Sequence, residues 1–154
     1  MKKHTNKQEV SYAMLRLFTR YMEIDKKTQT YGTKVPIHHA EIHMVSAIAQ
    51  NPGIHVRGLA EYFSYSSASV SEIIRKLEKK NLVRKETDSK NLSRLSLYLT
   101  KKGELAHEEH QKYHRMLEAM MEEELNDLTD EQIDCFITLF HNLLIKMEDF
   151  EEKI

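Results

Sequence analysis

The sequence predicts a mostly α-helical fold with one small β-wing, and two observations carry that prediction. Apolar residues recur at three- and four-residue intervals through six segments, which is the spacing of amphipathic helices. Residues 82–100 instead read as two short strands joined by the polar turn 88–94, which is the pattern of a hairpin. Helices followed by a hairpin of this kind form a winged helix-turn-helix. A chain of 154 residues suits one such domain.

The first two helices are expected at residues 7–29 and 38–50. An apolar stripe runs along the first of them, and Gly32 and Pro36 punctuate its end. The break at residues 51–53, Asn-Pro-Gly, ends the second. The inner face of the second helix is expected to consist of Ile42, Val45, Ile48 and Ala49.

The helix-turn-helix is expected at residues 56–80. A short helix over 56–63 leads through a serine-rich turn into a helix over 67–80. Ser66 or Ser67 can cap the start of this second helix, and Asn81 suits the left-handed residue that often ends one. Its apolar residues fall on one narrow face, formed by Val70, Ile73, Ile74 and Leu77. The opposite face is small, hydroxyl-bearing and basic, so it is available to a partner.

Two further helices follow the hairpin, and they offer more apolar surface than a small core can cover. One spans 101–125, and the other begins after the capping box formed by Thr129 and Gln132. The first helix of the chain also carries more apolar surface than a small core can cover. The favoured explanation is a two-fold dimer whose helical ends interlock, and the alternative is that these faces cover a monomeric core.

The single domain, residues 1–154, therefore divides into parts with different roles. Residues 37–102 are expected to form the winged-helix part that binds DNA. Residues 5–32 and 103–154 are expected to form the helical part that dimerises.

Charge is unevenly distributed along the chain, although the formal net charge is −1. Residues 54–102 carry a net charge of +6 and residues 103–154 carry −11, counted from the sequence. A basic middle beside an acidic end indicates a nucleic-acid-binding surface. One cysteine, no signal peptide and no membrane-length apolar run favour a cytoplasmic protein without a membrane partner. Cys135 is expected to be a buried thiol rather than a redox sensor.

No pattern in the chain points to an enzyme. A metalloprotease motif needs two histidines four apart with a glutamate after the first, but His107 and His110 are three apart. The pair that is four apart, His110 and His114, has Gln111 in the glutamate position. The alternative of a protein-binding module without DNA contact is distinguished by salt, because DNA binding weakens steeply as ionic strength rises.

Several short motifs resemble one known family. They are Leu59-Ala60, Val70-Ser71, the run 77–83, the run 99–103 and the wing residues Asp88, Asn91 and Arg94. Together they resemble the multiple-antibiotic-resistance-regulator (MarR) family of bacterial winged-helix repressors. The resemblance implies a homodimer that binds a pseudo-palindromic operator and responds to an effector. Asn91 and Asn81 depart from the aspartate and glycine usual in the family, without affecting the fold.

The same resemblance implies which side chains face DNA. The recognition helix would present Ser67, Ser69, Glu72, Arg75 and Lys76 to the major groove, and the wing would contribute Lys90 and Arg94. Arginine suits guanine edges or a narrow minor groove, whereas serines and lysines mostly hold phosphates.

Nine histidines suggest what the effector is, but two branches of the family give different answers. Resemblance to the zinc-sensing branch (AdcR/ZitR-like) implies a zinc effector held by Glu23, His43, His110 and His114. Resemblance to a fatty-acid-synthesis repressor branch (FabT-like) implies instead an acyl or other organic effector. In that case the histidines form a structural or pH-responsive network. The sequence leaves these alternatives open.

Overall fold

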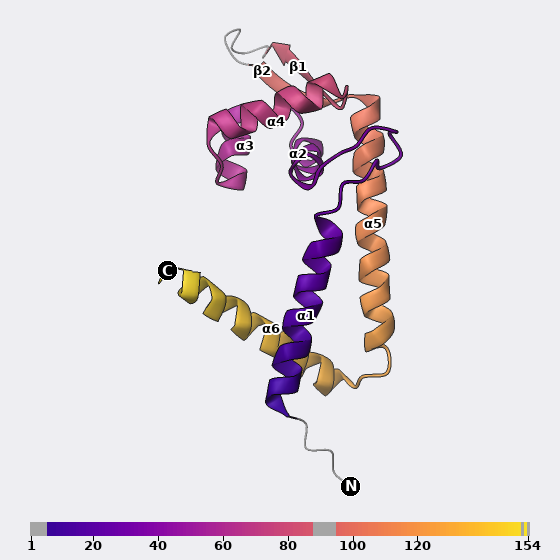
Figure 1. Cartoon of the computed structure of the whole chain (residues 1–154), viewed down its shortest axis with the longest axis vertical. Coiled ribbons are helices and arrows are strands. Elements are labelled where there is room, and N and C mark those ends of the chain that lie inside the picture. Colours follow the sequence, from indigo (N-terminus) through magenta and orange to yellow (C-terminus); the bar gives the residue numbers. More distant parts are fainter. Residues whose placement is uncertain (1–5, 88–94, 152, 154) are drawn as a thin grey trace. The chain divides into compact units, whose positions relative to one another are not determined.

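A computed structural model describes residues 6–87, 95–151 and 153, and it is mostly helical with one two-stranded sheet (Figure 1). In chain order the elements are α1 (Lys7–Asp25), α2 (His39–Gln50), α3 (Val56–Phe63), α4 (Ser67–Lys79), β1 (Val83–Thr87), β2 (Leu95–Leu99), α5 (Lys101–Leu125) and α6 (Asp130–Glu151). The chain forms two compact units, Met1–Gln111 and Lys112–Ile154. Among the described helices, none has the length and apolar character needed to cross a membrane.

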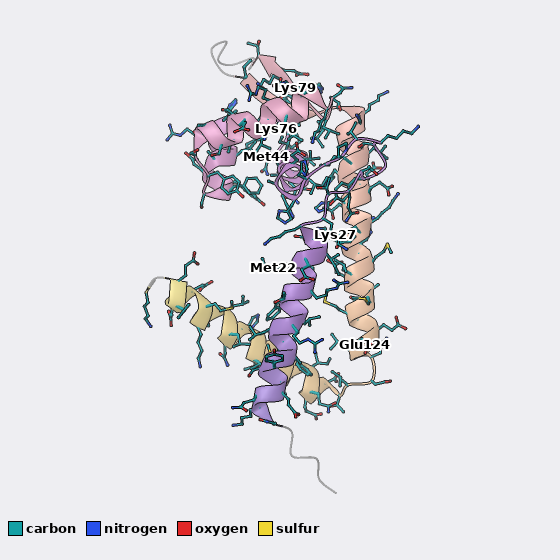
Figure 2. All side chains as sticks on the ribbon, viewed as in Figure 1. Met22, Lys27, Met44, Lys76, Lys79 and Glu124 are labelled. Atoms are coloured by element: carbon teal, nitrogen blue, oxygen red, sulfur yellow. The ribbon has the colours of Figure 1, made fainter. Side chains whose placement is uncertain are left out.

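Helix α2 is the centre of the winged-helix core. The buried apolar residues of the described chain all lie between Tyr31 and Ala106, and α2 contacts both α4 and β2. The predicted inner face of α2 is confirmed, but burial extends further around the helix. Met44, labelled in Figure 2, and Ala47 are buried as well, because α2 is enclosed by neighbours on more than one side.

Helix α1 ends four residues earlier than the sequence predicts, at Asp25 rather than residue 29. Gln29 instead pairs with Ile37 through two backbone hydrogen bonds of 2.8 and 3.2 Å. This bridge closes a loop in which Tyr31 adopts a left-handed φ of 43° and is buried. Apolar periodicity reports only local structure, so it could not reveal a pairing that forms across this loop.

The residues predicted to begin and end α4 have these roles in the structure. Ser66 Oγ accepts a hydrogen bond from the Ser69 amide at 3.1 Å, and it therefore caps the helix. Asn81 adopts a left-handed φ of 56° just after the helix. The buried face contains Val70, Ile74 and Leu77, which fixes the opposite face toward solvent.

Strands β1 and β2 form the antiparallel wing, with Val83 opposite Leu99 and Thr87 opposite Leu95. Leu97 and Leu99 of β2 are buried, whereas Leu95 is 49% exposed. The turn that joins the strands, residues 88–94, lies outside the described residues. Lys90 and Arg94, both predicted to contact DNA, belong to that turn.

A tight junction joins the end of α4 to the start of α5. The Thr100 hydroxyl donates to the Asn81 carbonyl at 2.7 Å and accepts from the Gly103 amide at 3.1 Å. A Cβ at Gly103 would lie 2.0 Å from the Leu82 carbonyl oxygen, so only glycine fits there. The backbone after the recognition helix is therefore held at a fixed distance from α5.

The helices outside the winged-helix core expose most of their apolar side chains. Neither α1 nor α6 contains a buried residue in the described chain. The capping box at the start of α6 is confirmed by reciprocal hydrogen bonds between Thr129 and Gln132. The prediction of a buried Cys135 is wrong for the single chain, where this residue is exposed because α6 buries none of its faces.

Candidate nucleic-acid interface and histidine cluster

The outward face of α4 is a continuous polar surface. A helical repeat places residues three and four apart on the same side, and the buried residues of α4 fix which side faces solvent. All five residues predicted to enter the major groove are exposed, namely Ser67, Ser69, Glu72, Arg75 and Lys76. Figure 2 shows Lys76 and Lys79 on this helix. The described structure therefore brings the α4 part of the predicted DNA surface together.

Ion pairing on this face leaves one arginine available. Lys76 Nζ lies 2.9 Å from Glu72 Oε1, one helical turn away. This contact with Lys76 lowers the pKa of Glu72, so the carboxylate stays ionised and offsets the charge of Lys76. Arg75 has no hydrogen-bond or ion-pair partner within the described part of the chain. Its guanidinium is thus free to donate to an external acceptor.

The end of α4 is anchored to the start of α2 by a buried ion pair. Lys80 Nζ lies 2.7 and 2.6 Å from the two carboxylate oxygens of Glu41, and it also donates to the Pro36 carbonyl at 2.8 Å. Glu41 in turn accepts from the His38 amide at 2.8 Å. Sequence reasoning missed this anchor, since Lys80 reads as one of several solvated lysines. The only available signal was Glu41 at the third position of its helix, where a capping box places an acid.

A cluster of one aspartate and two histidines joins the end of α1 to α2. Asp25 Oδ2 lies 2.6 Å from His39 Nε2 and 3.8 Å from His43 Nε2. The two imidazole rings are 4.3 Å apart between centroids. Burial and the negative charge of Asp25 raise the pKa of Tyr21, one turn earlier on α1. The side-chain donor atoms of Asp25, His39 and His43 all lie within 4.8 Å of one another, which is a spacing that a metal ion can bridge.

A second histidine network surrounds Ser46 in the core. Ser46 Oγ lies 3.1 Å from His110 Nδ1 and 3.2 Å from His107 Nδ1. His110 is buried, and its ring packs edge-on against Tyr31. Desolvation by burial lowers the pKa of His107, although the nearby Glu108 carboxylate opposes the shift. These contacts hold the rings of His107 and His110 beside Ser46.

The four residues predicted to bind zinc are not all brought together. His43 and His110 are neighbours, with ring centroids 5.3 Å apart. Glu23 instead forms an exposed ion pair with Arg20 at 3.2 Å, and it is Asp25 that lies beside His43. His114 belongs to the second unit, so its distance from the other three is not defined. The signal for the observed cluster was the four-residue spacing of His39 and His43, which matches that of His110 and His114.

The comparison with protein families gives one match, and it covers the segment that contains the polar face of α4. The MarR family model matches residues 37–92. Over this segment the chain is similar to the MarR family. The HTH-type transcriptional regulator YhjH of Bacillus subtilis is 29% identical over 132 residues, which are 86% of this chain and 75% of YhjH. The family-model match and the similarity to an HTH-type transcriptional regulator confirm the predicted resemblance to MarR-type winged-helix regulators.

Two solved MarR-like structures share this fold. FabT of Streptococcus pneumoniae, solved in complex with DNA, has a TM-score of 0.74 at 22% identity and covers 94% of this chain and 99% of its own. ZitR of Lactococcus lactis, described as a zinc-responsive MarR family member, has a TM-score of 0.71 at 18% identity. That match covers 92% of this chain and 99% of ZitR. Both likenesses confirm the fold.

Proposed function

We propose that this protein is a MarR-type repressor that binds a pseudo-palindromic operator in duplex DNA as a homodimer. The observation that carries the proposal is the exposed face of α4, where Arg75 has no ion-pair partner in the described chain. A helix of this width fits the major groove, and arginine donates two parallel hydrogen bonds to guanine. The structurally similar FabT was solved in complex with DNA, which supports DNA binding by a protein of this fold.

The wing completes the proposed contact with DNA. Lys90 and Arg94 belong to residues 88–94, which connect β1 to β2 in the sequence. Both residues carry positive charge, and the two strands follow the recognition helix in the chain. We assign Lys90 to a phosphate and Arg94 to the minor groove, as the resemblance to the family implies.

The proposed dimer, formed by residues 5–32 and 103–154, rests on the exposed apolar side chains of α1 and α6. Helix α6 exposes a series of large apolar side chains, namely Phe136, Ile137, Leu139, Phe140, Leu144, Ile145, Met147 and Phe150. Helix α1 exposes another, including Leu15, Leu17, Phe18 and Met22. Exposed apolar surface on this scale marks an interaction site, and a second copy of the chain covers it with two-fold symmetry. A symmetric dimer also presents two copies of α4 to two half-sites.

Duplex selection from a random pool tests this function directly. We expect the purified chain to enrich a two-fold symmetric sequence with half-sites about 10 base pairs apart, bound by two chains per duplex. A duplex with one scrambled half-site is the control, and it should bind more weakly. An asymmetric site bound by one chain, or no enrichment, contradicts the proposal.

Two kinds of effector are favoured by different observations. A transition-metal ion such as Zn²⁺ is favoured by the cluster of Asp25, His39 and His43. An acyl or other organic ligand is favoured by the hydrogen bonds between Ser46 and the rings of His107 and His110, which give those rings a structural use. Titration with buffered Zn²⁺ separates the two. A metal effector changes operator affinity and raises the melting temperature in proportion to the logarithm of ligand concentration over Kd, whereas an organic effector leaves both insensitive to Zn²⁺.

A further inference from the structure

We infer that a cleft between the end of α2, the base of the wing and the first turns of α5 binds a small organic cation, namely a primary amine with a short apolar body. This cleft shares no lining residue with the cluster of Asp25, His39 and His43. The inference rests on the proposed function, because such an amine would be the organic effector.

The size of the cleft suits a small molecule. Its volume is about 240 Å³, and all of its lining residues belong to one compact unit of the chain. Pockets for drug-sized ligands measure about 300–1,000 Å³. The cleft therefore has room for a ligand with one charged group and a short apolar body.

Part of the lining is apolar and rigid. Ile48 and Leu99 are buried residues of the core, and the ring of Tyr98 lies beside them. The Tyr98 hydroxyl lies 3.0 Å from the position that a Cβ would take on Gly53, and the Arg84 guanidinium lies 5.1 Å from the centre of the tyrosine ring. These contacts hold the ring in place, so it provides a fixed surface for the apolar body of a ligand.

The charged part of the lining favours a cation. Glu104 and Glu108 are four residues apart on α5, so their side chains project from the same face and repel each other. Neither carboxylate has a hydrogen-bond or ion-pair partner within the described part of the chain. Arg84 also lines the cleft, but it is paired with Glu86 and its charge is already offset. An ammonium group beside the two carboxylates would relieve their repulsion, whereas an anion would increase it.

His107 supplies a third polar group to the cleft. Its Nδ1 lies 3.2 Å from Ser46 Oγ, which leaves Nε2 for a ligand. Burial lowers the pKa of His107, although Glu108 opposes the shift, so the ring is mostly neutral at pH 7. A neutral ring that donates from Nδ1 accepts at Nε2. Two carboxylates and one neutral imidazole are then three acceptors, which match the three N–H donors of a primary ammonium group.

The position of the cleft connects it to the wing. Arg84 of β1 and Tyr98 of β2 are paired across the two strands, and both line the cleft. A ligand that contacts Tyr98 and the glutamates of α5 would hold the base of the wing against α5. It would thereby act on the strands that flank residues 88–94, to which the proposed wing contacts with DNA belong.

Ligand-observed NMR on the full-length protein without DNA tests the site, with butylamine, benzylamine and phenethylamine as probes. We expect saturable binding of at least one amine, and at least about tenfold weaker binding of benzyl alcohol, which lacks the charge. Glu104→Gln and Glu108→Gln should each weaken amine binding about fivefold, because each removes one exposed charge. Ala49→Leu narrows the cleft without changing its charge, and it should weaken binding as well. Glu118→Gln, on the same helix but not lining the cleft, is the matched control and should bind as the wild type does.

Three results would overturn the inference. The first is that none of the three amines binds saturably, and the second is that benzyl alcohol or benzoate binds as tightly as benzylamine. The third is that the Glu104→Gln, Glu108→Gln and Ala49→Leu variants all bind the amines as the wild type does. Melting curves check that each variant folds, and the two glutamate variants carry the test if Ala49→Leu does not fold. Affinity for the selected duplex is measured with and without benzylamine, so that an amine-binding chain that fails to bind DNA contradicts the proposed function and not the site.

Discussion

Removing Lys80 should destabilise the protein far more than removing an exposed lysine or arginine. The Glu41 side chain is 5% exposed and that of Lys80 is 21% exposed, with contacts of 2.6 and 2.7 Å between them. Lys80→Met keeps the aliphatic stem but leaves the Glu41 carboxylate buried with only the His38 amide as a hydrogen-bond donor. Breaking a buried pair from one side costs about 3–5 kcal/mol. Since Lys80 is partly exposed, we expect a loss of about 3 kcal/mol.

An exposed pair in the same unit provides the matched control for Lys80→Met. Arg57 and Glu61 are 2.9 Å apart with side chains that are 87% and 67% exposed. Exposed pairs of this kind contribute about 0–1 kcal/mol, so Arg57→Met should change stability little. Urea denaturation followed by circular dichroism, at one protein concentration, gives both free energies of unfolding. The reasoning is refuted if Lys80→Met and Arg57→Met differ by less than about 1 kcal/mol.

Three further predictions concern the junction, the histidine network and the wing. Gly103→Ala places a Cβ 2.0 Å from the Leu82 carbonyl oxygen and should lower stability by about 2 kcal/mol or more in thermal melts. Gly58→Ala should be milder, because its Cβ would meet the Ile54 side chain at 3.0 Å and not a backbone atom. Burial lowers the pKa of His107, so the unfolded chain binds its proton first and stability should fall as pH drops below about 6.5. His107→Gln should reduce that loss between pH 7.5 and 5.5, and an equal loss in both proteins would contradict the assignment. Arg94→Ala should weaken operator binding at least about tenfold at moderate salt, measured by fluorescence anisotropy, and unchanged affinity would remove Arg94 from the interface.

The elements that the sequence predicted correctly are those defined by local chemistry. Ser66 caps α4, Asn81 ends it, and Thr129 with Gln132 starts α6, because each acts on backbone groups a few residues away. The exposed face of α4 followed from helical periodicity alone. The order of helices and strands could therefore be read before any tertiary contact was known.

Features that depend on contacts between distant segments were not predictable in the same way. The anchor between Glu41 and Lys80 joins residues 39 apart, and neither has a sequence pattern that names its partner. The bridge of Gln29 with Ile37, which follows the early end of α1, joins nearer residues but is likewise not reported by helical periodicity. Cys135 was predicted to be buried from the apolar character of its helix, yet that helix buries nothing within one chain.

The salt dependence of duplex binding by the wild type and by Arg75→Ala tests the central claim most directly. If the outward face of α4 reads DNA, wild-type affinity for the selected duplex should fall steeply between 50 and 200 mM salt. Arg75→Ala should bind at least about tenfold more weakly and discriminate less against a mismatched base pair in the half-site. Affinity that does not respond to salt, or an Arg75→Ala variant that binds and discriminates like the wild type, would contradict the account.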